Sequence, residues 1–383
     1  MAKKDKGVEV SINLKQFEEL VLNELNTPEG EMPATLLVCG EAGGGKTSIT
    51  EQLCKRAGYA TRMLRLSQID PTDLAGVPYL SDEVGPDGNK ITKFAQPALL
   101  PNWDEKCVII LDEPNRGRAE VKQAAFQMME GRGTISWRFN PAKHRIIALM
   151  NPANAQYHVD MMDPAMVNRC VLLHFKPELK EFLEFGYTVG IDERILQFLQ
   201  YEPEHLSVIT ENVDQDISWA TQRSWHRLSQ STCGRKLSTE AYYTYAAGCV
   251  GPDVAASYIA FCNDPDRPVK PSEVFSGYSK DLQQKFINHQ CDEKIDKALS
   301  TTFGVVMIVN NTPLKKIDID ILKSFYSTIK NDEVRTAFIK GLEVSKEKEE
   351  PGKWDALVRG MGVAKEALEI AREVQNIKLG KKK

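Results

Sequence analysis

The chain has 383 residues, of which 42% are hydrophobic, and its 49 Lys and Arg against 53 Asp and Glu give a net charge of −4. This composition is that of an ordinary globular protein, so it excludes a chain that is disordered throughout and a small disulfide scaffold. At roughly 100 to 200 residues per domain, the length predicts two or three domains.

Charge and apolar runs narrow the class further. No apolar run approaches the roughly 18 to 20 residues that are needed to cross a bilayer, and the chain begins with a charged stretch. We therefore expect a cytoplasmic protein without membrane association. The near-neutral charge gives no general attraction to nucleic acid, and the 8 cysteines form no C-x-x-C pair that would indicate a zinc or redox site.

Short apolar runs in the first half predict a parallel sheet. A helical pattern at 120–130 ends in glycines, and alternation of strands with helices is typical of a parallel sheet that is covered on both faces. The predicted fold class is α/β, with five parallel strands in the first domain. These strands are predicted at residues 34–39, 60–66, 107–111, 145–150 and 170–175.

Strand-like runs stop after residue 175. Helical patterns follow at 177–184, 192–201, 224–229, 239–249 and 253–262, and the segment 263–274 contains Pro265 and Pro268, which suit a linker. We predict a nucleotide-binding domain over 1–178, a helical lid domain over 179–262 and a mostly helical C-terminal extension over 263–383.

The first strand leads into a glycine-rich phosphate-binding loop. The sequence at 40–47 fits G-x-x-x-x-G-K-[ST] and opens a helix. Backbone N–H groups turn around a phosphate there, and the helix N-terminus adds further donors. The alternative is a flexible turn with a chance lysine. The predicted nucleotide-binding residues are Gly40, Glu41, Ala42, Gly43, Gly44, Gly45, Lys46, Thr47, Ser48 and Asp112.

Polar residues also follow two other predicted strands. Asp112 and Glu113 come after the third strand, and Asn151 comes after the fourth. We expect Thr47 and Asp112 to hold Mg²⁺, and Glu113 to polarise the water that attacks ATP. Asn151 is predicted to contact the γ-phosphate and that water, although Asn-Pro is also a common turn starter.

These elements, in this order, resemble the AAA+ ATPases and specifically the MoxR-like group. The resemblance rests on Leu-Asp-Glu-Pro-Asn-Arg at 111–116, on 70–78 and 163–169, and on Thr-Gln-Arg-Ser-Trp at 221–225, where Gln222 replaces the usual proline. It covers about residues 15–262. It implies a P-loop AAA+ core with ATP and Mg²⁺ as cofactors, ATP hydrolysis, and a lid arginine, Arg223, that contacts ATP of its own subunit.

The position of Arg169 predicts an assembly. Arg169 precedes the fifth strand, whereas Glu113 and Asn151 follow theirs, and a strand of five or six residues spans about 17 to 20 Å. If Arg169 touches a γ-phosphate, that phosphate belongs to a neighbouring subunit. The resemblance favours a hexameric ring; the alternative for Arg169 is an ion pair at a helix end. Arg116 and Arg118 are further trans-acting candidates or ordinary surface residues.

The resemblance implies a chaperone-like motor that remodels or matures a protein partner, often one with a von Willebrand factor A domain. Tyr79, Trp137 and Phe139, the last two in an expected hairpin at 133–140, are candidate substrate-contacting aromatics, although such side chains are more often core. Two alternatives are a nucleic-acid remodelling ATPase, for which no basic stripe is evident, and a nucleotide-gated scaffold with little turnover.

Overall fold

The computed structural model describes residues 10–152, 161–208, 217–343, 350 and 352–370. The chain divides into two compact units, with the boundary between Glu178 and Leu179. Among these residues, none of the helices combines the length and the hydrophobicity that a membrane-spanning segment needs.

The first unit is built on a parallel sheet of six strands, in the order β1-β8-β2-β7-β6-β3. A sixth strand, β1, is the outermost strand of the sheet and pairs with β8, so the prediction of five strands is wrong. With only two residues, β1 is too short to show an alternating pattern in the sequence. The other five confirm the predicted strands. The bounds are β1 (Ser11–Ile12), β2 (Leu36–Cys39), β3 (Ala60–Arg65), β6 (Cys107–Asp112), β7 (His144–Met150) and β8 (Val171–Phe175).

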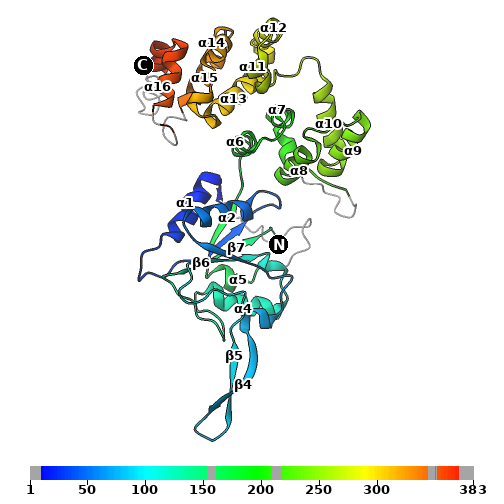
Figure 1. Ribbon diagram of the computed structural model, residues 1–383. Coiled ribbons are helices and arrows are strands. Elements are labelled where there is room, and N and C mark those ends of the chain that lie inside the picture. The colour runs from blue at the N-terminus through cyan, green and yellow to red at the C-terminus, as the bar shows by residue number, and fades with distance from the viewer. Residues whose placement is uncertain (1–9, 153–160, 209–216, 344–349, 351, 371–383) are drawn as a thin grey trace, which may run out of the picture. The chain divides into compact units, whose positions relative to one another are not determined.

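Helices cover both faces of this sheet (Figure 1). Successive residues of β6 point to opposite faces. Val108 and Ile110 pack with helices α1 and α2, while Ile109 and Leu111 pack with α3, α4 and α5. The helix predicted at 120–130 is confirmed as α4. The bounds are α1 (Leu14–Leu25), α2 (Lys46–Arg56), α3 (Pro71–Ala75), α4 (Ala119–Met129) and α5 (Pro164–Val167).

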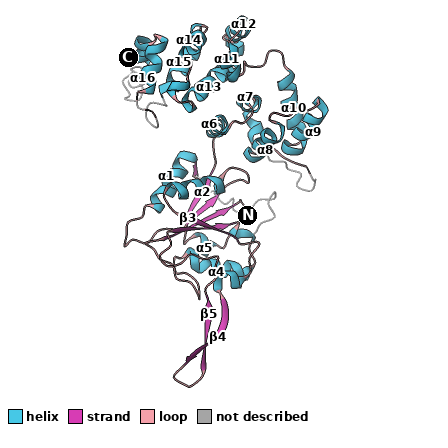
Figure 2. Cartoon of the chain, in the orientation of Figure 1, coloured by secondary structure: helices cyan, strands magenta, loops and turns pink. Residues whose placement is uncertain are grey.

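A two-stranded hairpin extends from the first unit, as Figure 2 shows in magenta. Its strands, β4 (Val77–Val84) and β5 (Lys90–Ala95), pair antiparallel and form a sheet of their own. Several large apolar side chains on it are exposed, among them Leu80 at 69% and Tyr79 at 49%. No core of the first unit covers this hairpin within the described residues.

The second unit contains only helices among its described residues. Trp225, Phe198 and Tyr258 are fully buried in the core of its first part, and their rings lie in edge or tilted contacts that suit aromatic packing. The five helices predicted before residue 263 are confirmed. They are α6 (Leu179–Val189), α7 (Glu193–Tyr201), α8 (Gln222–Thr232), α9 (Thr239–Val250) and α10 (Pro252–Asn263), with the 3₁₀ turn η2 (Pro203–Leu206).

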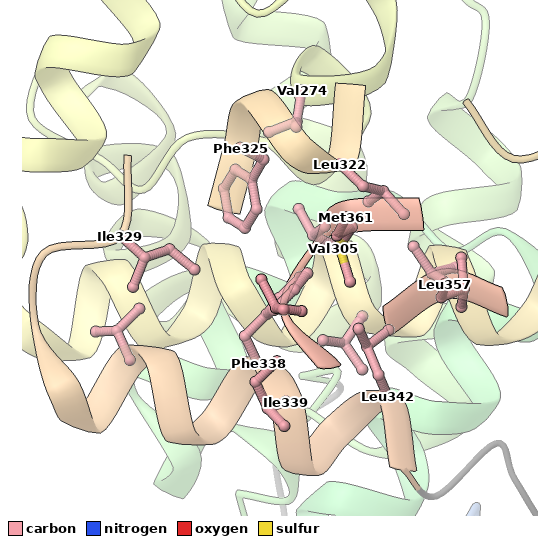
Figure 3. Packing of buried hydrophobic residues seen from close by; sticks show 14 of the residues in the cluster. Val274, Val305, Leu322, Phe325, Ile329, Phe338, Ile339, Leu342, Leu357 and Met361 are labelled. Atoms are coloured by element: carbon pink, nitrogen blue, oxygen red, sulfur yellow. The ribbon is translucent and has the colours of Figure 1, made fainter. Parts of the chain in front are cut away.

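A second core lies farther along the chain, where Phe325 and Phe338 pack with Leu322, Leu342 and Met361 (Figure 3). Each part thus has its own core, but the division of this unit into a lid domain and an extension stays a prediction. The helices are α11 (Pro271–Gly277), α12 (Lys280–Asn288), α13 (Ile295–Asn311), α14 (Ile319–Ser327), α15 (Asp332–Glu343) and α16 (Lys353–Met361), with 3₁₀ turns η3 (Asp292–Lys294) and η4 (Leu314–Lys316).

Candidate nucleotide site

Three strands of the first unit, β2, β6 and β7, end at the same edge of the sheet, and predicted site residues follow each of them. In the parallel register, Cys39 at the end of β2 lies beside Met150 of β7, and Asp112 of β6 lies beside Leu149. Backbone bonds continue past the strand ends: Gly40 N–H donates to the Met150 carbonyl at 3.2 Å, and Glu113 N–H donates to the Leu149 carbonyl at 2.9 Å. Gly40, Glu113 and Asn151 therefore start from neighbouring positions.

The phosphate-binding loop runs from β2 into α2, as the sequence predicts. Gly43 and Gly45 have φ angles of 80° and 87°, in the left-handed region that favours glycine. Gly45 precedes the first turn of α2 and supplies no side-chain cap. The N–H groups of that first turn therefore lack a side-chain acceptor from the cap, which is the arrangement that binds a phosphate.

Lys46 is the residue that joins the loop to the rest of the site. Its side chain is nearly buried, at 8% exposure. Its Nζ donates to the Glu41 carbonyl at 2.8 Å, to the Gly40 carbonyl, and to Asn151 Oδ1 at 3.1 Å. The ammonium group thus lies within the loop and against the amide that follows β7.

Asp112, at the end of β6, and Glu113, which follows it, each pair with an arginine. Asp112 lies 3.7 Å from Arg65, and Glu113 lies 3.6 Å from Arg116. Arg65 was not predicted as a site residue, because its place beside Asp112 follows from the pairing of β3 with β6, which the sequence does not show. Both pairs are partly exposed, so the net stabilisation from each is small.

Glu113 has an unusual backbone. Its φ is 51°, and it is the one non-glycine residue with a positive φ in the described part of the chain. It also precedes Pro114, the first residue of the 3₁₀ turn η1 (Pro114–Arg116), and a following proline restricts the backbone further. Such conformations cost of order 1 to 3 kcal/mol and cluster at functional sites.

Asn115 is a second residue that the sequence analysis did not assign to the site. It is 2% exposed, and its Nδ2 donates to the Asn151 carbonyl at 3.0 Å. The signal was the asparagine of the 111–116 motif, which was used only for the resemblance.

Arg169 lies at the other end of the sheet from these groups. It precedes β8, whose Val171 is the register partner of Leu36 at the start of β2. Within its own chain it pairs with Glu130, donates to the Ala165 carbonyl at 2.8 Å, and lies over the Phe126 ring. Arg169 thus lies, as predicted, at the opposite end of the sheet from the edge that carries Lys46, Glu113 and Asn151, which we call the nucleotide edge. Its contacts in this structure are those of the ion-pair alternative.

Two further arginines, Arg118 and Arg223, were predicted as candidates for contact with ATP. Arg118 pairs with Asp70 at 3.0 Å. Arg223 is exposed at the start of α8, in the second unit, and its contact with ATP stays a prediction.

Two of the three candidate substrate-contacting aromatics are core residues, which was the alternative for each. Trp137 is 2% exposed and Phe139 is 8% exposed. The Trp137 ring stacks on His144, and its Nε1 donates to the Pro101 carbonyl at 2.8 Å. No residue of 133–140 lies in a strand, so the prediction of a hairpin there is wrong. Tyr79, on β4, is the one of the three that is exposed.

The residues at the nucleotide edge suit Mg²⁺ and ATP. Thr47 offers a hydroxyl and Asp112 a carboxylate, the oxygen ligands that Mg²⁺ prefers. Lys46 supplies a positive charge inside the loop, where its Nζ donates to the Gly40 and Glu41 carbonyls. Ser48 is exposed on the first turn of α2.

Comparisons with known proteins agree with this geometry. Residues 35–170 match the sequence model of the AAA domain, dynein-related subfamily. An AAA domain with a P-loop α/β fold therefore occupies this part of the chain. No curated protein sequence matches the chain.

Two of the solved structures that match this chain share little sequence with it. A proposed ATPase from Cytophaga hutchinsonii is 13% identical, with 92% of this chain and 90% of that chain covered and a TM-score of 0.33. The RuvB Holliday junction branch migration motor of Thermotoga maritima is 12% identical, with 73% and 78% covered and a TM-score of 0.33. Similarity at this level carries no argument about activity or partner.

Proposed function

We propose that this protein is an ATP-hydrolysing AAA+ motor of MoxR type, which works as an oligomeric ring and remodels or matures a protein partner. The observation that carries the proposal is the contact between Lys46 Nζ and Asn151 Oδ1 at 3.1 Å. It brings a phosphate-loop lysine and an amide from another strand end together, at the edge where Asp112 and Glu113 also lie.

Each group at this edge has a distinct role in ATP hydrolysis. Lys46 and the loop N–H groups bind the phosphates, and Thr47 and Asp112 hold Mg²⁺, which neutralises charge on the phosphates. Glu113 accepts a proton from the attacking water. Asn151 orients that water and a γ-phosphate oxygen without adding charge. The ion pairs of Asp112 and Glu113 with their arginines are compatible with these roles, because each pair is partly exposed and 3.6 Å or more apart and a carboxylate accepts several hydrogen bonds.

The ring belongs to the proposal because of Arg169. This residue precedes β8 and cannot reach the nucleotide edge of its own sheet across a strand of about 17 Å. In the ring, Arg169 exchanges its ion pair with Glu130 for the γ-phosphate of the next subunit. Arg223 acts on the nucleotide of its own subunit. A heterologous contact of this kind closes into a ring or continues as a helix, and we propose a ring of six subunits.

The β4–β5 hairpin is the proposed contact with the protein partner, with Tyr79 as its aromatic. Its charges are mixed: Lys90 pairs with Asp82, and Lys93 pairs with Glu83. This balance favours a protein partner over the phosphates of nucleic acid. A protein with a von Willebrand factor A domain is one candidate class.

The proposal is tested by comparing two lysine variants of α2. Lys46→Ala should lose ATP binding, because it removes the ammonium group inside the loop. Lys55→Ala, which changes an exposed lysine in the last turn of the same helix, is the matched control. Equilibrium binding of a fluorescent ATP analogue measures both. Equal affinity in the two variants would contradict the assignment of the phosphate loop.

A further inference from the structure

Asn115 is a buried polar residue that the roles above do not use. It belongs to η1, the short turn that follows Glu113, and only 2% of it is exposed. Its Nδ2 donates to the Asn151 carbonyl at 3.0 Å, across 36 positions of sequence. Because a carbonyl only accepts, the amide nitrogen must face Asn151, and the orientation of the Asn115 amide is fixed.

The other end of the same amide has no partner. Asn115 Oδ1 is buried and accepts no hydrogen bond from any residue that the structure describes. Leaving a buried acceptor unpaired costs about 1 to 3 kcal/mol. An apolar side chain of similar size would avoid this cost, so stability alone does not explain an asparagine at this position. Its one hydrogen bond, to Asn151, therefore needs another explanation.

The hydrogen bond from Asn115 to Asn151 connects the segments that carry Glu113, the proposed base, and Asn151, which is proposed to orient the attacking water. On one side, Arg116 N–H donates to the Glu113 carbonyl at 2.9 Å and closes η1 over Glu113. On the other side, Asn151 holds Lys46 through its own side chain. Asn115 therefore connects the turn that carries Glu113 with the strand end that carries Asn151.

The backbone of Glu113 needs such a connection. A residue with φ of 51° before a proline relaxes unless its surroundings hold it. If the turn relaxed, the Glu113 carboxylate would move relative to Asn151, and a displacement of about 1 Å in such a site can lower the rate about 100-fold.

We propose that Asn115 is a positioning residue for ATP hydrolysis: its bond to Asn151 fixes the Glu113 carboxylate and the Asn151 amide relative to each other. This inference rests on the proposed ATPase function. It assigns to Asn115 no contact with ATP, so ATP binding should not depend on it, while turnover should.

The test uses the full chain with Asn115→Leu, which keeps the volume of the side chain and removes both amide groups. We expect turnover to fall at least tenfold, the ATP dissociation constant to stay within threefold of wild type, and the melting temperature to stay the same or rise. Asn115→Ala, which introduces no bulk, should show the same separation of turnover from binding.

Asn140→Leu is the matched control. Asn140 is also buried, at 7% exposure, and also donates to a backbone carbonyl, that of Trp103 at 2.7 Å, but it precedes β7 and lies away from the nucleotide edge. It should lower the melting temperature and leave turnover per folded molecule unchanged. Wild-type turnover in both Asn115 variants would overturn the inference, as would a turnover loss matched by weaker ATP binding. An inactive wild-type protein would instead contradict the proposed function.

Discussion

At the scale of single residues, the phosphate-binding loop combines positions that demand glycine with one that does not. A Cβ on Gly40 would lie 2.6 Å from the Phe175 carbonyl oxygen, a backbone atom of β8. A Cβ on Gly44 would lie 3.4 Å from its nearest neighbour, the Glu41 carbonyl, which is an ordinary contact. Neither glycine has a positive φ, so the two differ in space rather than in backbone conformation.

This difference predicts opposite outcomes for two alanine variants of the loop. Gly40→Ala should push the loop away from β8 and weaken ATP binding at least tenfold, which corresponds to about 1.4 kcal/mol. Gly44→Ala should bind ATP like the wild type. Isothermal titration with ATP measures both affinities. Equal affinities would show that the loop tolerates the shift.

At the scale of elements, the start of β7 is organised by a neutral histidine. His144 is fully buried, its Nδ1 accepts from the Asn140 N–H at 3.0 Å, and its Nε2 lies 3.0 Å from the Asn102 carbonyl. The carbonyl can only accept, so the proton is on Nε2. Burial lowers the pKa of His144 below its usual value of 6.5.

The lowered pKa predicts acid sensitivity of the first unit. As the pH falls below about 6.5, the unfolded chain takes up a proton on this histidine before the folded chain does, so stability falls by at most about 1.4 kcal/mol per pH unit. His144→Gln keeps a donor and an acceptor but does not titrate. Thermal unfolding from pH 7 to pH 5 should show a smaller loss in the variant. Parallel losses would assign the sensitivity to other groups.

The sequence predicted those elements whose pattern is set by a core. Strands such as β6 are apolar because both of their faces are buried, and the predicted helices carry an apolar stripe. The two residues of β1 are too few for a pattern. The β4–β5 hairpin has apolar side chains on a sheet that no described core covers, so alternation did not identify it.

The candidate site was predictable to the extent that parallel strands end at a common edge. This rule placed Gly40, Glu113 and Asn151 together. It does not indicate which side chains pair across that edge, so Arg65 and Asn115 were missed. The sequence left Trp137 open between a substrate contact and the core, because its burial depends on His144 and Pro101, which are contacts made only in the folded unit.

At the scale of the whole molecule, the proposed ring requires subunits to complete each other's sites. Arg169→Ala should bind ATP normally and hydrolyse it slowly, because an arginine supplied to the transferring phosphate contributes about 10³ to 10⁵ in rate in GTPases. Glu113→Gln should also be slow. Mixing the two creates interfaces with an intact Glu113 and an intact Arg169, so activity should return.

Titration of one variant against the other at fixed total protein measures this effect. Turnover should be greatest at an intermediate ratio, once a labelled-subunit control shows that subunits exchange. Flat activity in spite of exchange would mean that Arg169 acts within its own chain or has no role in hydrolysis.

We propose that the edge of the sheet that carries Lys46, Glu113 and Asn151 hydrolyses ATP, and Glu113→Gln removes the proposed base while it keeps the size and shape of the side chain. The variant and the wild type should bind ATP with the same affinity. Phosphate release in a single turnover should be slower in the variant by about 10² to 10⁴, the usual contribution of a general base. Release at the wild-type rate by Glu113→Gln would contradict hydrolysis with Glu113 as the base.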